Sequence, residues 1–134
     1  LSLDGNIADI QPVKEDWDIQ FSQYTHVFDG TPPMPYLVSG VLSNRYMVEV
    51  AQVFDKDFSA ITLEDITIYT FSKDINTIGY NWKEYSFDSG GYTIFSDQNY
   101  IIKSTKGKYY KFHFIDFYDA SGNKGTPTFE LQEL

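Results

Sequence analysis

The sequence predicts an all-β protein, a single domain over residues 1–134 that forms a mainly antiparallel meandering sheet or open barrel with little helix. Short runs of residues alternate between apolar and polar side chains, which is the period of a strand with one buried face. Clusters of Gly, Pro, Asn, Asp and Ser separate these runs and are typical of the turns in antiparallel sheets. A chain of 134 residues with 42% hydrophobic residues is the size of one domain.

Residues 1–6 have the composition of a strand end followed by a turn. Residues 17–28 alternate, and we expect one face of this strand to point to the core. That face carries Trp17, Ile19, Phe21 and Val27. His26 then falls on the wetter face of the strand. Residues 29–35 contain three prolines and one glycine, which predicts an exposed, stiff loop outside any sheet and suited to the lip of a site.

Residues 36–42 and 46–54 are predicted to be two strands that pair through a turn at residues 43–45. Residues 61–71 are ambiguous. Their Ile, Thr and Tyr residues favour a strand, whereas residues 62–65 and 72–75 have the spacing of helix N-terminal caps. We expect a strand followed by one helical turn. Three short strands are predicted at residues 82–87, 92–95 and 100–103, with turns at residues 88–91 and 96–99.

The C-terminal residues 109–134 are predicted to form a β-hairpin. Six aromatic residues lie on both faces of its first arm, at residues 109–118, so we expect both faces to be covered or one face to bind a ligand. Residues 119–125 supply the small side chains that a chain reversal needs. Residues 126–134 return as a strand with Thr128, Glu130 and Gln132 on its solvent face.

Composition limits the function and the partners. The net charge of −9 and the pI of about 4.4 would repel a phosphate backbone, so we expect no nucleic-acid binding. The absence of cysteine excludes disulfides, thiolate metal sites and cysteine nucleophiles. No apolar run reaches the roughly 20 residues of a membrane-spanning helix. Because the chain begins at Leu1 rather than at methionine, we expect a processed or truncated chain whose secretion signal and lipid anchor lay upstream.

The sequence does not suggest an enzyme. It has only two histidines and none of the common hydrolase, metalloprotease or nucleotide-binding motifs. The acidic pair Asp55 and Asp57 lies beside a predicted turn, where we expect solvated carboxylates. We therefore expect no catalytic residues and no metal site formed by the protein alone.

Several short motifs together resemble the HmuY-like family of Bacteroidetes surface proteins. They are the segments at residues 17–21, 36–41 and 78–83 and the hairpin at residues 109–134. The resemblance covers residues 1–134 and implies an HmuY-like all-β fold. The best-known members of the family are all-β, haem-binding lipoproteins that pass haem to an outer-membrane receptor. It implies a hemophore-like role in iron acquisition, at the cell surface or secreted, with a TonB-dependent outer-membrane receptor as partner.

The resemblance also implies iron ligands, which in this family are two histidines or two methionines on loops. One ligand position falls on or beside Phe87, and residues 48–98 contain neither histidine nor methionine, so the family ligands are not recovered. Four other residues have suitable atoms. We expect His113 to be a hydrogen-bonded, partly buried histidine and Met47 to fill the core, which leaves His26 and Met34.

The expected cofactor-binding residues are His26, Met34, Tyr85, Phe87 and Tyr92, with haem held by apolar contacts and at most one protein ligand. The alternative for His26 is an ordinary solvated histidine. Five tyrosines at strand ends could frame a flat ligand: Tyr36, Tyr80, Tyr85, Tyr92 and Tyr100. The same rings suit a sugar or a protein partner. A second function therefore stays open, an HmuY-like fold without haem that serves as a protein- or carbohydrate-interaction module of an outer-membrane assembly.

Overall fold

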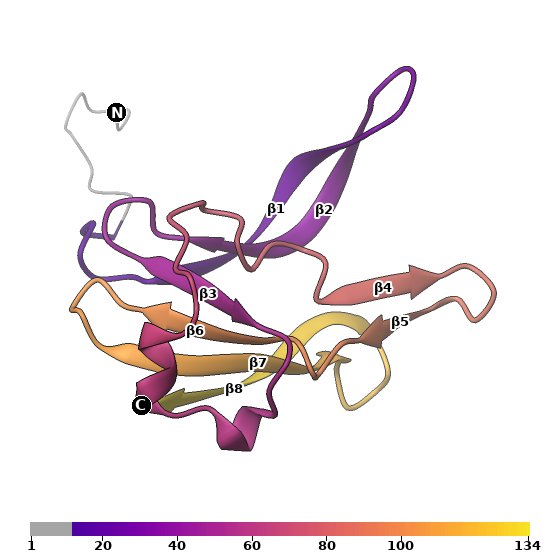
Figure 1. Ribbon diagram of the computed structural model, residues 1–134. Helices are drawn as coiled ribbons and strands as arrows, with labels where there is room; N and C mark the ends of the chain where they lie inside the picture. The colour runs from indigo at the N-terminus through magenta and orange to yellow at the C-terminus, as the bar shows by residue number, and fades with distance from the viewer. Residues whose placement is uncertain (1–11) are drawn as a thin grey trace, which may run out of the picture.

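The centre of the fold is an antiparallel sheet of four strands in the order β3-β6-β7-β8 (Figure 1). This computed structural model describes residues 12–134, so the strand end and turn expected at residues 1–6 lie outside the described residues. The strands are β3 (Glu49–Val53), β6 (Asn99–Lys103), β7 (Tyr109–Tyr118) and β8 (Lys124–Glu133). The expected C-terminal hairpin is confirmed, since β7 pairs with β8 across a turn that begins at Asp119.

Two separate hairpins complete the strands. The first pairs β1 (Ile19–Phe28) with β2 (Met34–Ser43), and the second pairs β4 (Lys83–Ser86) with β5 (Gly91–Ile94). Short 3-10 helices, η1 (Phe58–Ala60) and η2 (Leu63–Thr67), follow β3. The all-β, antiparallel prediction is confirmed, and the sheets do not close into a barrel. Among the described residues, no helix has both the length and the apolar character to cross a membrane.

Both faces of the central sheet are covered, as the aromatic first arm of the C-terminal hairpin requires. On one face Trp82 stacks on Phe114, with ring centroids 3.6 Å apart and planes at 10°. The buried members of this larger cluster are Val41, Val48, Val50, Ile78, Trp82, Tyr100, Ile102, Phe112, Phe114 and Phe117. The other face buries Ala51, Val53, Ile61 and Ile101. Alternation along β3 and β6 thus sends neighbouring residues into two different cores.

The expected pairing of residues 36–42 with residues 46–54 is wrong. Strand β2 pairs with β1, and β3 pairs with β6. Residues 43–45, expected to form a hairpin turn, instead attach the end of β2 to the segment before β1. The Asn44 side chain is fully buried, and its Nδ2 donates to the carbonyl oxygens of Lys14 (2.7 Å) and Trp17 (2.8 Å). These bonds hold the segment before β1 beside the end of β2. The chain then continues into β3, which pairs with β6.

The expected strand at residues 61–71 is also wrong, because this segment contains η2. The spacing of residues 62–65 is a capping box, in which the Thr62 N–H donates to Asp65 Oδ2 at 2.7 Å. The second cap-like spacing does not begin a helix. Ser72 pairs with Val50 in an isolated β-bridge, and its Oγ accepts from the N–H of Asp74 at 3.0 Å.

The predicted facing of the first strand is wrong in its outer half. Val27 is 53% exposed, whereas Tyr24 and His26 are half-buried. The reason is that Tyr80 covers the even-numbered face of β1 near its end. Phe21, nearer the start of the strand, is 41% exposed but packs edge-on against the core residue Phe114. The loop at residues 29–35 is exposed as expected, but Met34 and Pro35 already belong to β2. A proline fits there because β2 is an edge strand. Met47, expected in the core, is 55% exposed.

Candidate functional site

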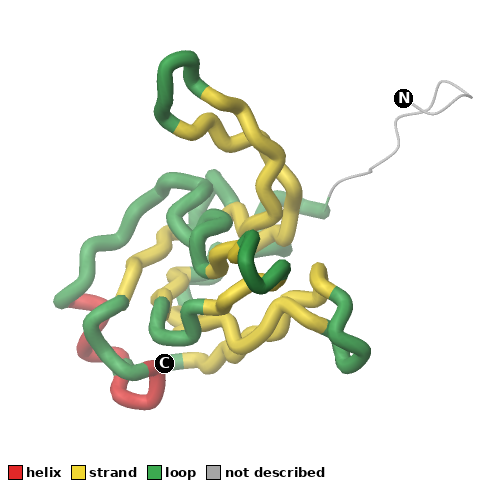
Figure 2. Tube along the Cα trace, turned by 90° about the vertical axis from the view of Figure 1, so that its right-hand side faces the viewer, coloured by secondary structure: helices red, strands yellow, loops and turns green. Residues whose placement is uncertain are grey.

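The five expected cofactor-binding residues lie on the two hairpins outside the central sheet. Hairpin β1-β2 rises away from the body of the molecule, and hairpin β4-β5 extends to the same side in Figure 1. Figure 2, turned by 90°, shows the β1-β2 hairpin as the part that projects farthest from the described body of the chain. The fold therefore presents two arms whose bases pack on the core, through Val41 and Tyr92, and whose outer ends project from it.

On the first hairpin, His26 and Met34 share one face with Phe28 and Tyr36. The register pairs His26 with Tyr36 and Phe28 with Met34, and directly opposed residues project to the same face. The His26 ring lies between two aromatic rings, 4.7 Å from Phe28 and 4.8 Å from Tyr80. No hydrogen bond from a described residue engages either His26 nitrogen. Met34 is 58% exposed, so its thioether is open to a ligand.

Tyr80 closes the lower end of this face and connects it to the second hairpin. Tyr80 lies in the segment that leads into β4, and its ring also packs against Phe28 at 5.9 Å. Burial raises the pKa of Tyr24, and the neighbouring Tyr80 phenol raises it further. The sequence indicated Tyr80 as a strand-end aromatic, but its contact with His26 depends on chain segments that are distant in sequence.

On the second hairpin, Tyr85, Phe87 and Tyr92 form one aromatic group. Tyr85 is paired with Tyr92, and their rings are 5.1 Å apart, while Tyr85 and Phe87 are 5.2 Å apart. Phe87 is 91% exposed at the turn. The Tyr92 ring also packs on Phe117 at 5.1 Å, which fixes the base of the hairpin to the core.

The structure thus divides the expected residues into two groups. His26 and Met34 share one hairpin face, and the three aromatic residues share the other hairpin. No ring contact among the described residues joins the two groups. Tyr100, expected to frame a ligand, is fully buried in the core, and this burial raises its pKa. The strand-end position of Tyr100 was therefore misleading.

A buried lysine links the bases of the two hairpins. Lys83 in β4 donates through Nζ to the carbonyl oxygen of Ser39 in β2 at 2.6 Å. Its ammonium group lies 4.0 Å from the centre of the Trp82 ring and 4.8 Å from that of Phe117. Burial lowers the pKa of Lys83 to about 8. The sequence did not mark this residue, because a lysine in an amphipathic strand is ordinarily solvated.

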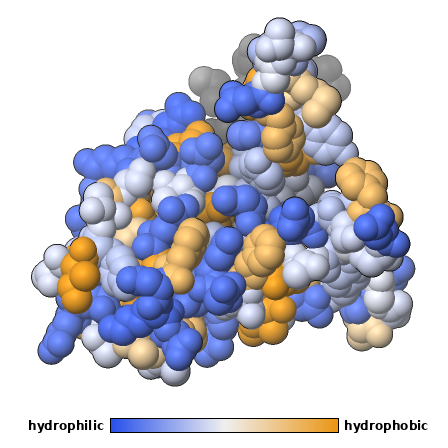
Figure 3. Space-filling view, turned by 45° about the vertical axis from the view of Figure 1, so that its right-hand side comes forward, coloured by the Kyte–Doolittle hydropathy of each residue, from blue (hydrophilic) through white to orange (hydrophobic). Residues whose placement is uncertain are grey.

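These surfaces can hold a flat, largely apolar ligand by ring contact. Figure 3 shows apolar side chains on the projecting part at the top of the molecule, among polar ones. The β1-β2 hairpin offers one imidazole and one thioether as candidate ligands for iron, from His26 and Met34. Among the described residues, no group of three His, Cys, Asp or Glu side chains has the arrangement of a metal site.

His113, the second histidine, lies in a cleft away from these hairpins. Its Nδ1 contacts the carbonyl oxygen of Ser96 at 2.9 Å, and its Nε2 contacts Glu130 at 3.3 Å. The ring stacks on Phe58 at 4.1 Å. The expectation of a hydrogen-bonded, partly buried histidine is therefore confirmed.

Comparison with known proteins agrees with the family resemblance. The family model described as HmuY protein matches residues 4–131 of the chain, which is nearly its whole length. No curated protein matches the chain.

Proposed function

The chain belongs to the HmuY family, and from this premise we propose that it is a non-enzymatic protein that binds haem or a related tetrapyrrole at the cell surface. It captures the ligand, as an outer-membrane lipoprotein or a secreted protein, and passes it to a TonB-dependent outer-membrane receptor. The observation that carries the proposal is the aromatic face of the β1-β2 hairpin, where the His26 nitrogens are free of described hydrogen-bond partners.

The mode of binding follows from the side chains on the two hairpins. A porphyrin is flat and apolar over most of its area, and rings such as Phe28, Tyr80 and Tyr85 can stack on it or contact its edge. Iron would receive one protein ligand, His26 or Met34. Because the resemblance places one family ligand position on or beside Phe87, which cannot bind iron, we expect no second axial bond from the protein. The complex should therefore be weaker than one with two axial bonds.

Titration of the protein with ferric haem tests this proposal. We expect a Soret shift at micromolar protein, with a spectrum that changes in His26→Ala or in Met34→Ala. His113→Ala is the matched control, because His113 lies in the other cleft and already has two polar partners. A six-coordinate spectrum that survives both hairpin substitutions would place the ligands elsewhere. Absence of any Soret shift would reject haem binding.

The exposed apolar residues favour a second function if haem does not bind. Phe87 is 91% exposed, and Val27 and Leu37 are exposed on the face of the first hairpin opposite to His26. Such residues are typical of contact surfaces for proteins or sugars. The protein would then be an interaction module of an outer-membrane assembly. Co-purification of the full chain with outer-membrane proteins, lost in Phe87→Ala, would support this function.

A further inference from the structure

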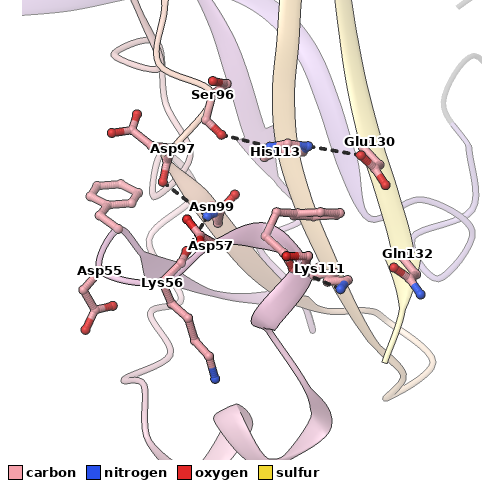
Figure 4. Close-up of a pocket in the computed structure, with 13 residues that line it drawn as sticks. Asp55, Lys56, Asp57, Ser96, Asp97, Asn99, Lys111, His113, Glu130 and Gln132 are labelled. Carbon is pink, nitrogen blue, oxygen red and sulfur yellow. Dashed lines mark hydrogen bonds and ion pairs between the residues drawn. The ribbon is translucent and has the colours of Figure 1, made fainter.

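A wide cleft lies on the side of β7 that carries Lys111 and His113, away from the two hairpins. Its volume is about 970 Å³, which lies within the range of small-molecule sites. Figure 4 shows its walls: the segment from Asp55 to Asp57, the turn with Ser96 and Asp97, and the strands that carry His113 and Glu130.

The cationic groups of this cleft already have partners. Lys56 Nζ donates to both carboxylate oxygens of Asp65 at 2.8 Å. Lys111 Nζ donates to the carbonyl oxygens of Phe58 (3.0 Å) and Ile61 (3.3 Å). His113 contacts Ser96 and Glu130 through its two nitrogens. Most donors of these groups are therefore engaged, and Lys56 is neutralised by Asp65, whereas Lys111 keeps its positive charge in the wall of the cleft.

Several hydrogen-bond acceptors of the cleft, in contrast, have no partner among the described residues, and the first is on Asn99. Its side chain is 1% exposed, and its Nδ2 donates to the carbonyl oxygens of Lys56 (2.8 Å) and Asp97 (3.3 Å). These two acceptors fix the orientation of the amide, and they leave Asn99 Oδ1 without a partner among the described residues. A buried, unpaired acceptor is unfavourable in a folded protein, so it requires an explanation. Figure 4 shows this amide in the middle of the cleft, between Asp97 and His113.

Two carboxylates beside this amide are also free. Neither Asp57 nor Asp97 has a hydrogen bond or ion pair through its side chain within residues 12–134. At the rim, Phe54 is 45% exposed, and aromatic faces attract cations. The cleft thus offers two negative charges, one buried acceptor and an aromatic ring. The chain's net charge of −9 adds a long-range attraction for cations.

We infer that this cleft binds a small organic cation, one that carries an alkylammonium or guanidinium group. Such a group supplies several N–H donors and a positive charge, which are the two properties that the free side chains of the cleft lack. The site is independent of the haem proposal, because its residues belong to the segment from Phe54 through η1, the turn before β6, and β6, β7 and β8 rather than to the hairpins.

NMR titration of the ¹⁵N-labelled protein tests the inference. The probes are N-acetylarginine methylamide and N-acetyllysine methylamide, each compared with a neutral analogue of similar shape, the citrulline and norleucine derivatives. We expect the cationic probes to shift the side-chain amide signal of Asn99 and the backbone signals of Asp57 and Asp97. The neutral analogues should leave these signals unchanged, and added NaCl should weaken the cationic probes.

Asp57→Asn and Asp97→Asn should each weaken binding roughly fivefold, the effect of losing one exposed charged contact. Asp88→Asn removes the same charge from the β4-β5 turn and serves as the control, with unchanged affinity. These positions are exposed, so the variants should fold normally. Equal shifts with the neutral analogues, or no localised shift with either cationic probe at roughly 10 mM, the weak limit of such contacts, would overturn the inference.

Discussion

Lys83 Nζ donates a 2.6 Å hydrogen bond to the carbonyl oxygen of Ser39, and this contact joins the bases of the two hairpins that form the proposed haem site. The lysine has no carboxylate partner among the described residues and lies against the Trp82 and Phe117 rings. A buried cation of this kind is costly to keep charged. The contact between the two hairpins is therefore made by a group whose burial disfavours its charged form.

The stability contributed by Lys83 should rise with pH. Burial lowers its pKa in the folded protein to about 8, from an ordinary value of 10.5. Between these values the unfolded chain binds more protons than the folded chain, so the free energy of unfolding increases with pH, by at most about 1.36 kcal/mol per pH unit. Below pH 8 Lys83 is protonated in both the folded and the unfolded chain, so the folded protein bears the full cost of burying its charge.

Urea unfolding followed by tryptophan fluorescence at pH 7, 8.5 and 9.5 measures this effect. Lys83→Met keeps the length of the side chain and removes its titration, so the variant should lack this part of the rise. Parallel pH curves for the two proteins would show that Lys83 is not the group responsible.

Gly40→Ala should destabilise the fold by about 3 kcal/mol, the upper end of the usual range for overpacking. A Cβ at this position would lie 2.5 Å from the carbonyl oxygen of Gly79, where β2 meets the segment that leads to Tyr80. Gly90→Ala is the matched control. Its φ of +70° costs about 1–2 kcal/mol, but its Cβ would have open space. Chemical unfolding of both variants decides the matter, and a Gly40 variant no less stable than the Gly90 variant contradicts the prediction.

Phe87→Ala should weaken haem binding without changing stability. The side chain is 91% exposed, so its removal should change the free energy of unfolding by less than about 0.5 kcal/mol. In the proposed site, however, its ring and that of Tyr85 contact the porphyrin. Haem titration and urea unfolding measure the two effects separately. Ile68→Ala removes another exposed apolar side chain, 69% exposed and remote from the hairpins, and should alter neither property.

Asp65→Asn should cost about 1–2 kcal/mol, as the loss of a helix cap does. The buried carboxylate accepts from Lys56 Nζ and from the N–H of Thr62, and these bonds, the one from Lys56 first, lower the pKa of Asp65. A carboxylate whose pKa is lowered by folding stabilises the fold at pH values above the pKa of the unfolded chain. This stabilisation is lost as the pH falls through the pKa of the folded protein. The difference between wild type and variant in urea unfolding should therefore shrink in acid. Glu64→Gln in the same helix is the control, and a constant difference at all pH values would refute this account.

Local features of the sequence were sufficient for most of the elements. Alternation predicted β1, β6 and β7, the small residues after Tyr118 predicted the last turn, and the spacing of Thr62 and Asp65 predicted a capping box that the structure contains. These features depend on residues within a few positions of one another. The order of several short motifs, taken together, was also sufficient for the family.

Tertiary structure decided which segments meet. Strand β2 turned to β1 rather than to β3 because Asn44 binds the carbonyl oxygens of Lys14 and Trp17. His26 became half-buried because Tyr80, distant in sequence, packs on its face of β1. Asn99 Oδ1 is unpaired only because Lys56 and Asp97 occupy the donor end of the same amide. Alternation specifies that a strand has two faces, but the segments that fold against it determine which face is covered.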